Sequence, residues 1–231
     1  MITKHSIGYK SLIFFGLIIS SCDPLVNEFN DIEEAIMYRA NNIAEFSAKD
    51  TIKVMSWNIR FGVARLRFFG DGCGDRVILK KSEVYEALED LVKKIKMEDP
   101  DILLLQEVDV QSKKTGYIDQ AQWLVDHTDF NYGAYASMWE SQIILADGLG
   151  RVNTGNLILS KWELDNAERY QLPLRGDQDA LTKYFYLRRN VLKATVNMPG
   201  QPFYAVNTHA TAFATDETKQ KHLDKFKSIL D

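Results

Sequence analysis

The stretch that decides the fold is Asp101-Ile102-Leu103-Leu104-Leu105-Gln106-Glu107-Val108-Asp109. Four consecutive apolar residues follow the turn signal Pro100-Asp101 and lead into Gln106 and Glu107. A short unbroken apolar run of this kind is typical of a strand that is buried on both faces. Because side chains alternate along a strand, we expect Leu103, Leu105 and Glu107 to share one face.

Glu107 is the residue of this stretch whose environment needs an explanation. An acidic group at the mouth of a buried strand is costly unless a cation meets it. Mg²⁺ suits the position, because proteins usually hold it with one or two carboxylates while substrate phosphates supply further oxygens. The alternative is an ordinary strand-end glutamate that reaches solvent. This stretch alone leaves both interpretations open.

Two other predicted strands also end in polar side chains. Residues 52–59 alternate so that Asn58 lies at the end of a strand, and residues 203–209 place Asn207 and His209 on one face of another. Apolar periodicity predicts helices between Ser82 and Pro100, over 119–127 and over 218–230, and further strands over 132–139, 155–160, 163–172 and 184–197.

The composition is that of one globular domain. A chain of 231 residues with 45% hydrophobic content is long enough for one substantial core. Its formal charge of −4 gives no electrostatic footprint for tight nonspecific binding to DNA, although it does not exclude a nuclease.

The N-terminal segment has the pattern of a bacterial lipoprotein signal peptide. Lys4 and Lys10 form a positive region, residues 12–19 form an apolar run too short to span a bilayer, and Ser20-Ser21 precede Cys22. We therefore expect residues 1–22 to be the signal and Cys22 to be lipidated. A plain secretory signal with an incidental cysteine is the alternative.

The rest of the chain divides into two parts. Residues 23–50 are predicted to be a tether with a short helix, because Ile32, Ala35, Ile36 and Ile43 have rough helical spacing. Residues 51–231 are predicted to form the folded domain.

Four motifs in this order resemble the endonuclease/exonuclease/phosphatase superfamily. They are Ser56-Trp57-Asn58-Ile59-Arg60, Leu105-Gln106-Glu107-Val108-Asp109, Gly155-Asn156 leading into Ile158-Leu159-Ser160, and Asn207-Thr208-His209. The resemblance implies an α+β fold, a four-layer α/β/β/α sandwich of two mixed sheets that lie face to face with helices outside.

The resemblance also implies roles for individual residues. Glu107 matches the glutamate that binds a catalytic Mg²⁺, with Mn²⁺ or Ca²⁺ as alternatives, and Asn58 matches the asparagine beside that metal. His209 matches the histidine that contacts the scissile phosphate as a donor or acid. Asn207 would support the phosphate or the histidine, and Asn156 would lie near the phosphate pocket.

The pair Arg188-Arg189 adds a candidate from the residues themselves. A guanidinium fork suits phosphate geometry, so Arg188 is a candidate for phosphate binding. A solvated position in a strand or hairpin is the alternative.

The function that follows is a membrane-anchored, metal-dependent phosphoesterase of the bacterial cell envelope, located outside the cytoplasm. It would hydrolyse a phosphodiester or phosphomonoester in nucleic acid, a phospholipid headgroup or a sugar phosphate, as a monomer with no protein partner inferred. The alternative is a catalytically inactive module of the same fold that binds a phosphate ligand.

The resemblance departs from the family pattern at the C-terminal end. A Gly-Asp-x-Asn motif and an Asp-His pair, whose histidine is the usual general base, would follow the last predicted helix, but the sequence ends at Asp231. We therefore expect the domain to lack its C-terminal part, and the 231-residue chain to be inactive or nearly so without that segment.

Overall fold

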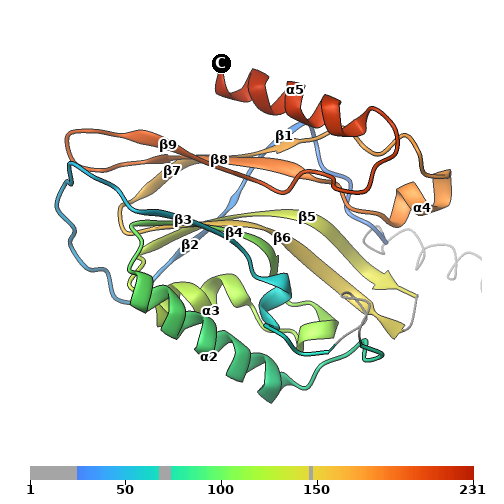
Figure 1. The fold of residues 1–231 in the computed structure, drawn as a ribbon, viewed down its shortest axis with the longest axis horizontal. Coiled ribbons are helices and arrows are strands. Elements are labelled where there is room, and N and C mark those ends of the chain that lie inside the picture. Colours follow the sequence, from blue (N-terminus) through green and yellow to red (C-terminus); the bar gives the residue numbers. More distant parts are fainter. Residues whose placement is uncertain (1–24, 68–73, 146–147) are drawn as a thin grey trace, which may run out of the picture.

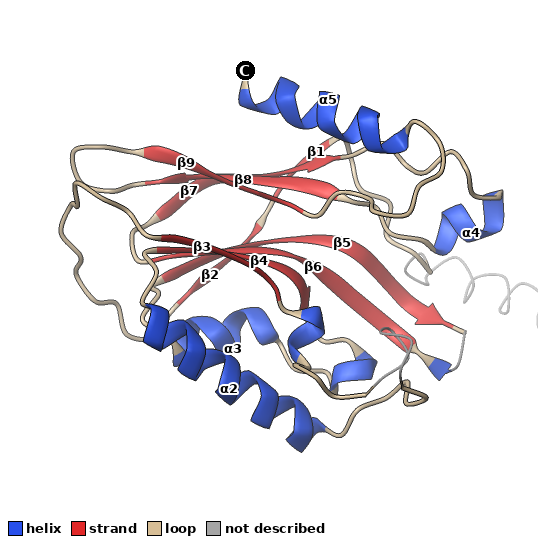
Figure 2. Cartoon of the chain, viewed as in Figure 1, coloured by secondary structure: helices blue, strands red, loops and turns tan. Residues whose placement is uncertain are grey.

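The computed structural model describes residues 25–67, 74–145 and 148–231. Two β-sheets lie face to face, with α2 (Lys81–Glu98) and α3 (Gln120–His127) outside one sheet and α5 (Thr218–Leu230) outside the other (Figures 1 and 2). The predicted four-layer α/β/β/α sandwich is confirmed.

The first sheet contains five strands and is mixed. Only β3 and β4 run parallel, and the other neighbours are antiparallel. In spatial order the strands are β2 (Ile36–Arg39), β5 (Tyr132–Ile144), β6 (Gly150–Ser160), β4 (Ile102–Asp109) and β3 (Val54–Asn58).

The second sheet is antiparallel throughout its described strands. In spatial order they are β1 (Ile32–Glu34), β7 (Leu164–Gln171), β8 (Asn190–Val196) and β9 (Phe203–Thr208). Short helices complete the fold: η1 (Arg60–Gly62), η3 (Lys113–Thr115) and α4 (Ala180–Phe185). Because α4 occupies residues predicted to begin a strand, β8 starts only at Asn190.

Strand β4 is buried on both faces, as its apolar run predicts. Leu103 and Leu105 pack under α2 and α3 in a core that includes Leu88 and Leu124. Ile102 belongs instead to the core between the two sheets. Burying a side chain of this size contributes about 1.5–3 kcal/mol. Strand β4 therefore stabilises both the interface between the first sheet and its helices and the interface between the two sheets.

The helix predicted within residues 23–50 is wrong. Residues of this segment form β1, which pairs with β7, and β2, which pairs with β5, at one edge of each sheet. Sheet edges offer unpaired backbone groups, and pairing with them overrides a weak helical spacing. Val26 is 1% exposed, so the folded domain begins on the N-terminal side of Thr51 and the segment from Leu25 is not a tether.

Helix α5 is fixed to the second sheet by a buried histidine. The backbone N–H of Thr211 donates to His222 Nδ1 over 3.3 Å, and His222 Nε2 lies 2.8 Å from the carbonyl oxygen of Pro173. Burial lowers the pKa of His222, which favours the neutral ring that these two bonds require. His222 therefore holds α5 and the loop after β9 together.

Within the described ranges, no helix has both the length and the apolar character needed to cross a membrane. The predicted signal peptide, including Cys22, lies outside the described residues.

Candidate metal and phosphate site

Glu107 lies at an irregularity in β4. The pairing of β4 with β6 shifts register between Leu105 and Val108, and Glu107 has φ 58°, in the left-handed region. A bulge of this kind re-aims a side chain, and a non-glycine residue keeps such a backbone only where its surroundings impose it. The simple alternation expected from Leu103 to Glu107 therefore ends at Leu105.

Asn58 meets Glu107 because β3 and β4 are parallel neighbours. The register places Asn58 opposite Gln106, so the C-terminal ends of both strands lie at the same end of the sheet. Asn58 Nδ2 donates to Glu107 Oε1 over 3.0 Å, and Asn58 Oδ1 accepts from the backbone N–H of Arg60 over 2.9 Å. An amide oxygen has two lone pairs, so Oδ1 retains one for a further ligand.

His209 reaches the same place from the second sheet. It follows β9 directly, and its Nδ1 lies 3.8 Å from Glu107 Oε1. Burial and the charge of Arg189 lower the pKa of His209 to about 4, so the imidazole is neutral at pH 7. Its Nδ1 is buried and has no hydrogen-bond partner in the described part of the chain.

Asn207 links the two sheets behind these residues. Gln106 Nε2 donates to Asn207 Oδ1 over 2.7 Å, and Asn207 Nδ2 donates to the carbonyl oxygens of Leu105 and Leu157 over 2.8 and 3.0 Å. Both amide hydrogens are thus used within the protein. Asn207 joins β9 to β4 and β6, which fixes the position of His209 relative to Glu107.

The structure separates the two neighbouring arginines. Arg188 Nη1 donates to the carbonyl oxygens of Tyr184 and Tyr186, and Arg188 Nη2 lies 3.7 Å from Glu28 Oε1. Arg189 Nη1 donates to the carbonyl oxygen of His209 over 2.7 Å. The guanidinium beside the site is therefore that of Arg189, which the sequence did not distinguish from its neighbour.

The guanidinium of Arg189 is buried beside the site and interacts with Tyr186 as well as with the carbonyl oxygen of His209. The residue is 9% exposed, and its Nε has no hydrogen-bond partner among the described residues. Burial lowers its pKa, while the charge of Glu107 acts in the opposite direction. A buried guanidinium normally stays charged, so its positive charge interacts with His209 and Glu107.

Asn156 is not among the residues that meet at the site. It is fully buried, and its Nδ2 donates to Asn190 Oδ1 over 3.0 Å. Asn190 belongs to β8 and Asn156 to β6, so the pair lies in the space between the two sheets.

The donor set suits a hard cation that keeps most of its own water. In the part of the chain that the structure describes, no three His, Cys, Asp or Glu side chains form a cluster that could hold a metal. Glu107 offers one carboxylate, with its side chain 20% exposed, and Asn58 offers Oδ1, although it is Asn58 Nδ2 that faces the carboxylate. Mg²⁺ is commonly bound by one or two carboxylates with water and substrate phosphates, so these residues fit it.

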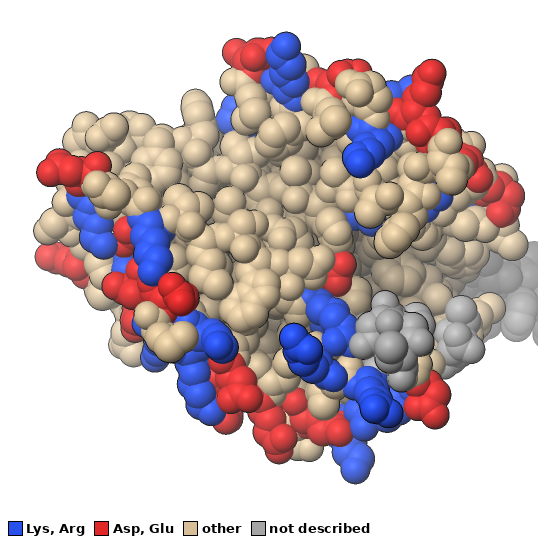
Figure 3. All heavy atoms as spheres, viewed as in Figure 1, with Lys and Arg blue, Asp and Glu red and all other residues tan. Residues whose placement is uncertain are grey.

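The pocket beside Asn58 is lined by charged side chains, which are Arg60, Arg65, Asp90, Lys93 and Lys94. On the face drawn in Figure 3, charged side chains of both signs gather towards the outer helices, and the surface between the two sheets is mainly uncharged. No continuous basic stripe follows this face, in keeping with the net charge of −4.

Comparison with known proteins identifies the family and the fold of the chain. Residues 55–229 match the model of the endonuclease/exonuclease/phosphatase family. An endonuclease/exonuclease/phosphatase from Beutenbergia cavernae is similar in structure, with 19% identity, a TM-score of 0.54, and coverage of 78% of this chain and 44% of that one.

A family protein from Leptotrichia buccalis has 14% identity, a TM-score of 0.51, and coverage of 78% and 63% respectively. The chain thus spans less than two thirds of the length of both solved structures. No curated protein sequence matches the chain. The family model covers most of the sequence, and the chain belongs to the endonuclease/exonuclease/phosphatase family.

Proposed function

We propose that this protein hydrolyses phosphoester bonds with a divalent cation held by Glu107 and Asn58. Members of the family are typically metal-dependent phosphoesterases. The observation that carries the proposal is the meeting of Asn58, Glu107 and His209 at one end of the sandwich, with 3.0 and 3.8 Å between their polar atoms.

Each residue has a role that its geometry supports. When bound, the cation supplies Lewis-acid stabilisation of a phosphoryl oxygen. Glu107 contributes the negative charge that holds the cation, and Asn58 orients the carboxylate through its amide. His209 is neutral at pH 7 and donates a hydrogen bond to a phosphate oxygen. Arg189 adds a fixed positive charge for the phosphate, which suits preorganised stabilisation of developing charge.

The substrate class is a phosphodiester or a phosphomonoester. Nucleic acid, a phospholipid headgroup and a sugar phosphate all present the phosphoryl oxygens that this site would bind. The net charge of −4 gives no electrostatic advantage to a long polyanion. A panel of single-stranded DNA, sphingomyelin and inositol phosphates, compared at one salt concentration, distinguishes these substrates.

One observation favours the alternative of a binding module. His127 stacks on Trp123 with 4.1 Å between ring centroids, and His222 lies under α5. Among the described histidines, His209 alone lies at the site, and its depressed pKa makes it a poor base at neutral pH. A module that binds metal and phosphate with little turnover is therefore the second candidate function.

Mn²⁺ titration followed by electron paramagnetic resonance tests the proposal, because Mn²⁺ reports binding without turnover. We expect one saturable site, with release of Mn²⁺ by excess Mg²⁺. Hydrolysis of bis(4-nitrophenyl) phosphate by the same sample separates a competent enzyme from a binding module. A chain that shows no saturable Mn²⁺ site and no Mg²⁺-dependent hydrolysis would contradict the proposed function.

We also propose that the protein is a lipoprotein of the bacterial cell envelope, anchored by its lipid outside the cytoplasm. The positive Lys4 and Lys10, the apolar run 12–19 and the small residues before Cys22 support this. Mass spectrometry of the protein isolated from bacterial membranes is expected to find a mature N-terminus at a lipid-modified Cys22. An unmodified mature N-terminus elsewhere in the chain would contradict the anchor.

A further inference from the structure

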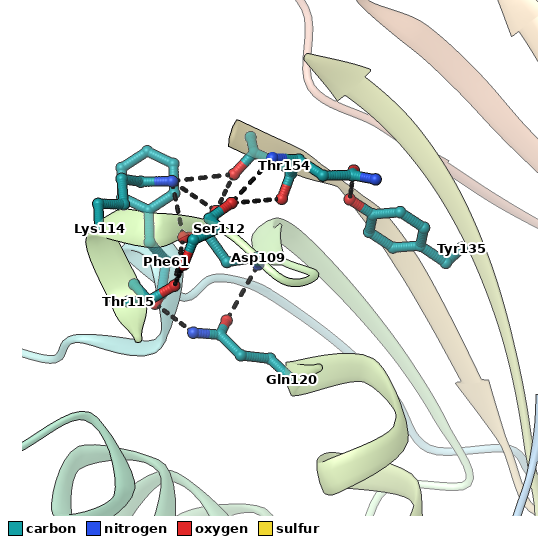
Figure 4. A network of polar contacts seen from close by, with 9 residues as sticks. Phe61, Asp109, Ser112, Lys114, Thr115, Gln120, Tyr135 and Thr154 are labelled. Atoms are coloured by element: carbon teal, nitrogen blue, oxygen red, sulfur yellow. Dashed lines mark hydrogen bonds and ion pairs between the residues drawn. The ribbon is translucent and has the colours of Figure 1, made fainter. Parts of the chain in front are cut away.

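A buried polar network lies directly behind the proposed metal site. Lys114 Nζ is 2.6 Å from both carboxylate oxygens of Asp109, and the hydroxyls of Thr115 and Thr154 also donate to that carboxylate. Figure 4 shows these side chains converging on Asp109. All four residues are at most 2% exposed.

Stability alone does not account for such a network. The free energy that an ion pair loses on leaving water is about as large as the attraction between its two charges. Apolar residues of the same volume therefore often stabilise a fold equally well. A buried, fully hydrogen-bonded network is well suited to fixing the position of the segments that it joins. The segments joined by this network are those that carry Glu107 and Asn58.

Gln120 connects the two segments directly. The backbone N–H of Asp109 donates to Gln120 Oε1 over 3.0 Å, and Gln120 Nε2 donates to the carbonyl oxygen of Phe61 over 2.7 Å. Asp109 follows Glu107 by two residues, and Phe61 follows Asn58 by three. Gln120 is fully buried in α3, so a single side chain from a helix holds both strand ends (Figure 4).

Lys114 makes a second connection between the same segments. Besides its ion pair with Asp109, its Nζ lies 4.1 Å from the centroid of the Phe61 ring. Phe61 has φ 60° and Glu107 has φ 58°, both in the left-handed region. Backbones of this kind persist where surrounding contacts impose them, and the network supplies contacts next to both residues.

We propose that Gln120 and Lys114 are positioning residues for the metal site, which set the distance between Asn58 and Glu107. The inference rests on the proposed function, because it requires Glu107 to bind the cation. Neither residue touches the cation. Gln120 acts through the backbone of Asp109 and of Phe61. Lys114 acts through the side chains of the same two residues.

The test compares Mn²⁺ affinity in Gln120→Met with that in Asn131→Leu. Gln120→Met keeps the length of the side chain and removes both hydrogen bonds. Asn131 is the matched control, since it is 4% exposed and its amide bonds the carbonyl oxygens of Ala44 and Lys161 at the other end of β4. We expect roughly 10-fold weaker Mn²⁺ binding in Gln120→Met, and an affinity within about twofold of wild type in Asn131→Leu.

Two further measurements keep the inference testable if Gln120→Met folds poorly. Thr115→Val removes one hydroxyl from the network and is expected to weaken Mn²⁺ binding in the same direction, by less. In metal-free protein, amide hydrogen exchange in η1 is expected to be faster in either variant than in wild type, because η1 loses part of its support.

The outcomes separate this inference from the proposed function. Wild-type affinity in both Gln120→Met and Thr115→Val would overturn the positioning role. An equal loss in Asn131→Leu would also overturn it, because general destabilisation would then explain the effect. Loss of Mn²⁺ binding in Glu107→Gln but not in the network variants leaves the proposed function intact. A Glu107→Gln protein that binds like wild type removes the metal site and this inference with it.

Discussion

Glu107→Gln is expected to weaken Mn²⁺ binding by at least about 100-fold. Loss of a residue that merely orients a metal ligand costs roughly 10- to 100-fold, and Glu107 is the one carboxylate that the described site offers the cation. Glutamine has the same shape, and its Oε1 still accepts from Asn58 Nδ2, so the change removes charge with little effect on packing. Electron paramagnetic resonance titration with Mn²⁺ measures the change.

Glu140→Gln is a matched control for this substitution. Glu140 lies on β5, and its Oε2 accepts from Asn27 Nδ2 over 3.0 Å, the same kind of bond that joins Asn58 to Glu107. We expect Glu140→Gln to keep wild-type Mn²⁺ affinity. If any form of the protein hydrolyses a phosphoester, its Mg²⁺ dependence should also disappear in Glu107→Gln. Equal affinities in the two variants would refute Glu107 as the ligand.

The sequence allowed the central strand and its polar end to be predicted, because both depend on local pattern. The apolar run after Pro100 predicts a buried strand. The apolar pattern also predicts the strands at whose ends Asn58, Glu107 and His209 lie. The bulge at Glu107 was not predictable, since it arises from pairing with β6. The Lys114 network was not predictable for a similar reason, because its members lie on five separate elements, η1, β4, η3, α3 and β6.

Other errors also have physical causes in long-range pairing. The helical spacing of Ile32 to Ile43 is weak, and it gives way to pairing with β7 and β5. Asn156 sits on a strand that is buried on both faces, and its side chain bonds Asn190 in the space between the two sheets. Arg188 and Arg189 are adjacent, and which of them faces His209 depends on where β8 starts.

Arg189→Met is expected to weaken binding of inorganic phosphate roughly 10- to 100-fold in the presence of Mg²⁺, because a hydrogen bond to a charged group contributes about 1.5–3 kcal/mol. Isothermal titration calorimetry measures the affinity. Arg188→Met is the matched control, since that guanidinium is equally buried but bonds the carbonyl oxygens of Tyr184 and Tyr186. We expect Arg188→Met to bind phosphate like wild type. The reverse pattern would show that Arg188 is the phosphate ligand.

The same substitution changes the titration of His209 in metal-free protein. Burial and the charge of Arg189 hold the pKa of His209 at about 4, below its ordinary value, so the unfolded chain binds a proton at higher pH than the folded chain does. The free energy of unfolding therefore falls as pH drops from about 6.5 to about 4. Removing the Arg189 charge should raise the pKa of His209 in the folded protein. The pH range over which the free energy of unfolding falls then becomes narrower, because its lower limit rises. Nuclear magnetic resonance titration of the His209 ring measures this shift, and an unchanged pKa would mean that burial alone keeps the imidazole neutral.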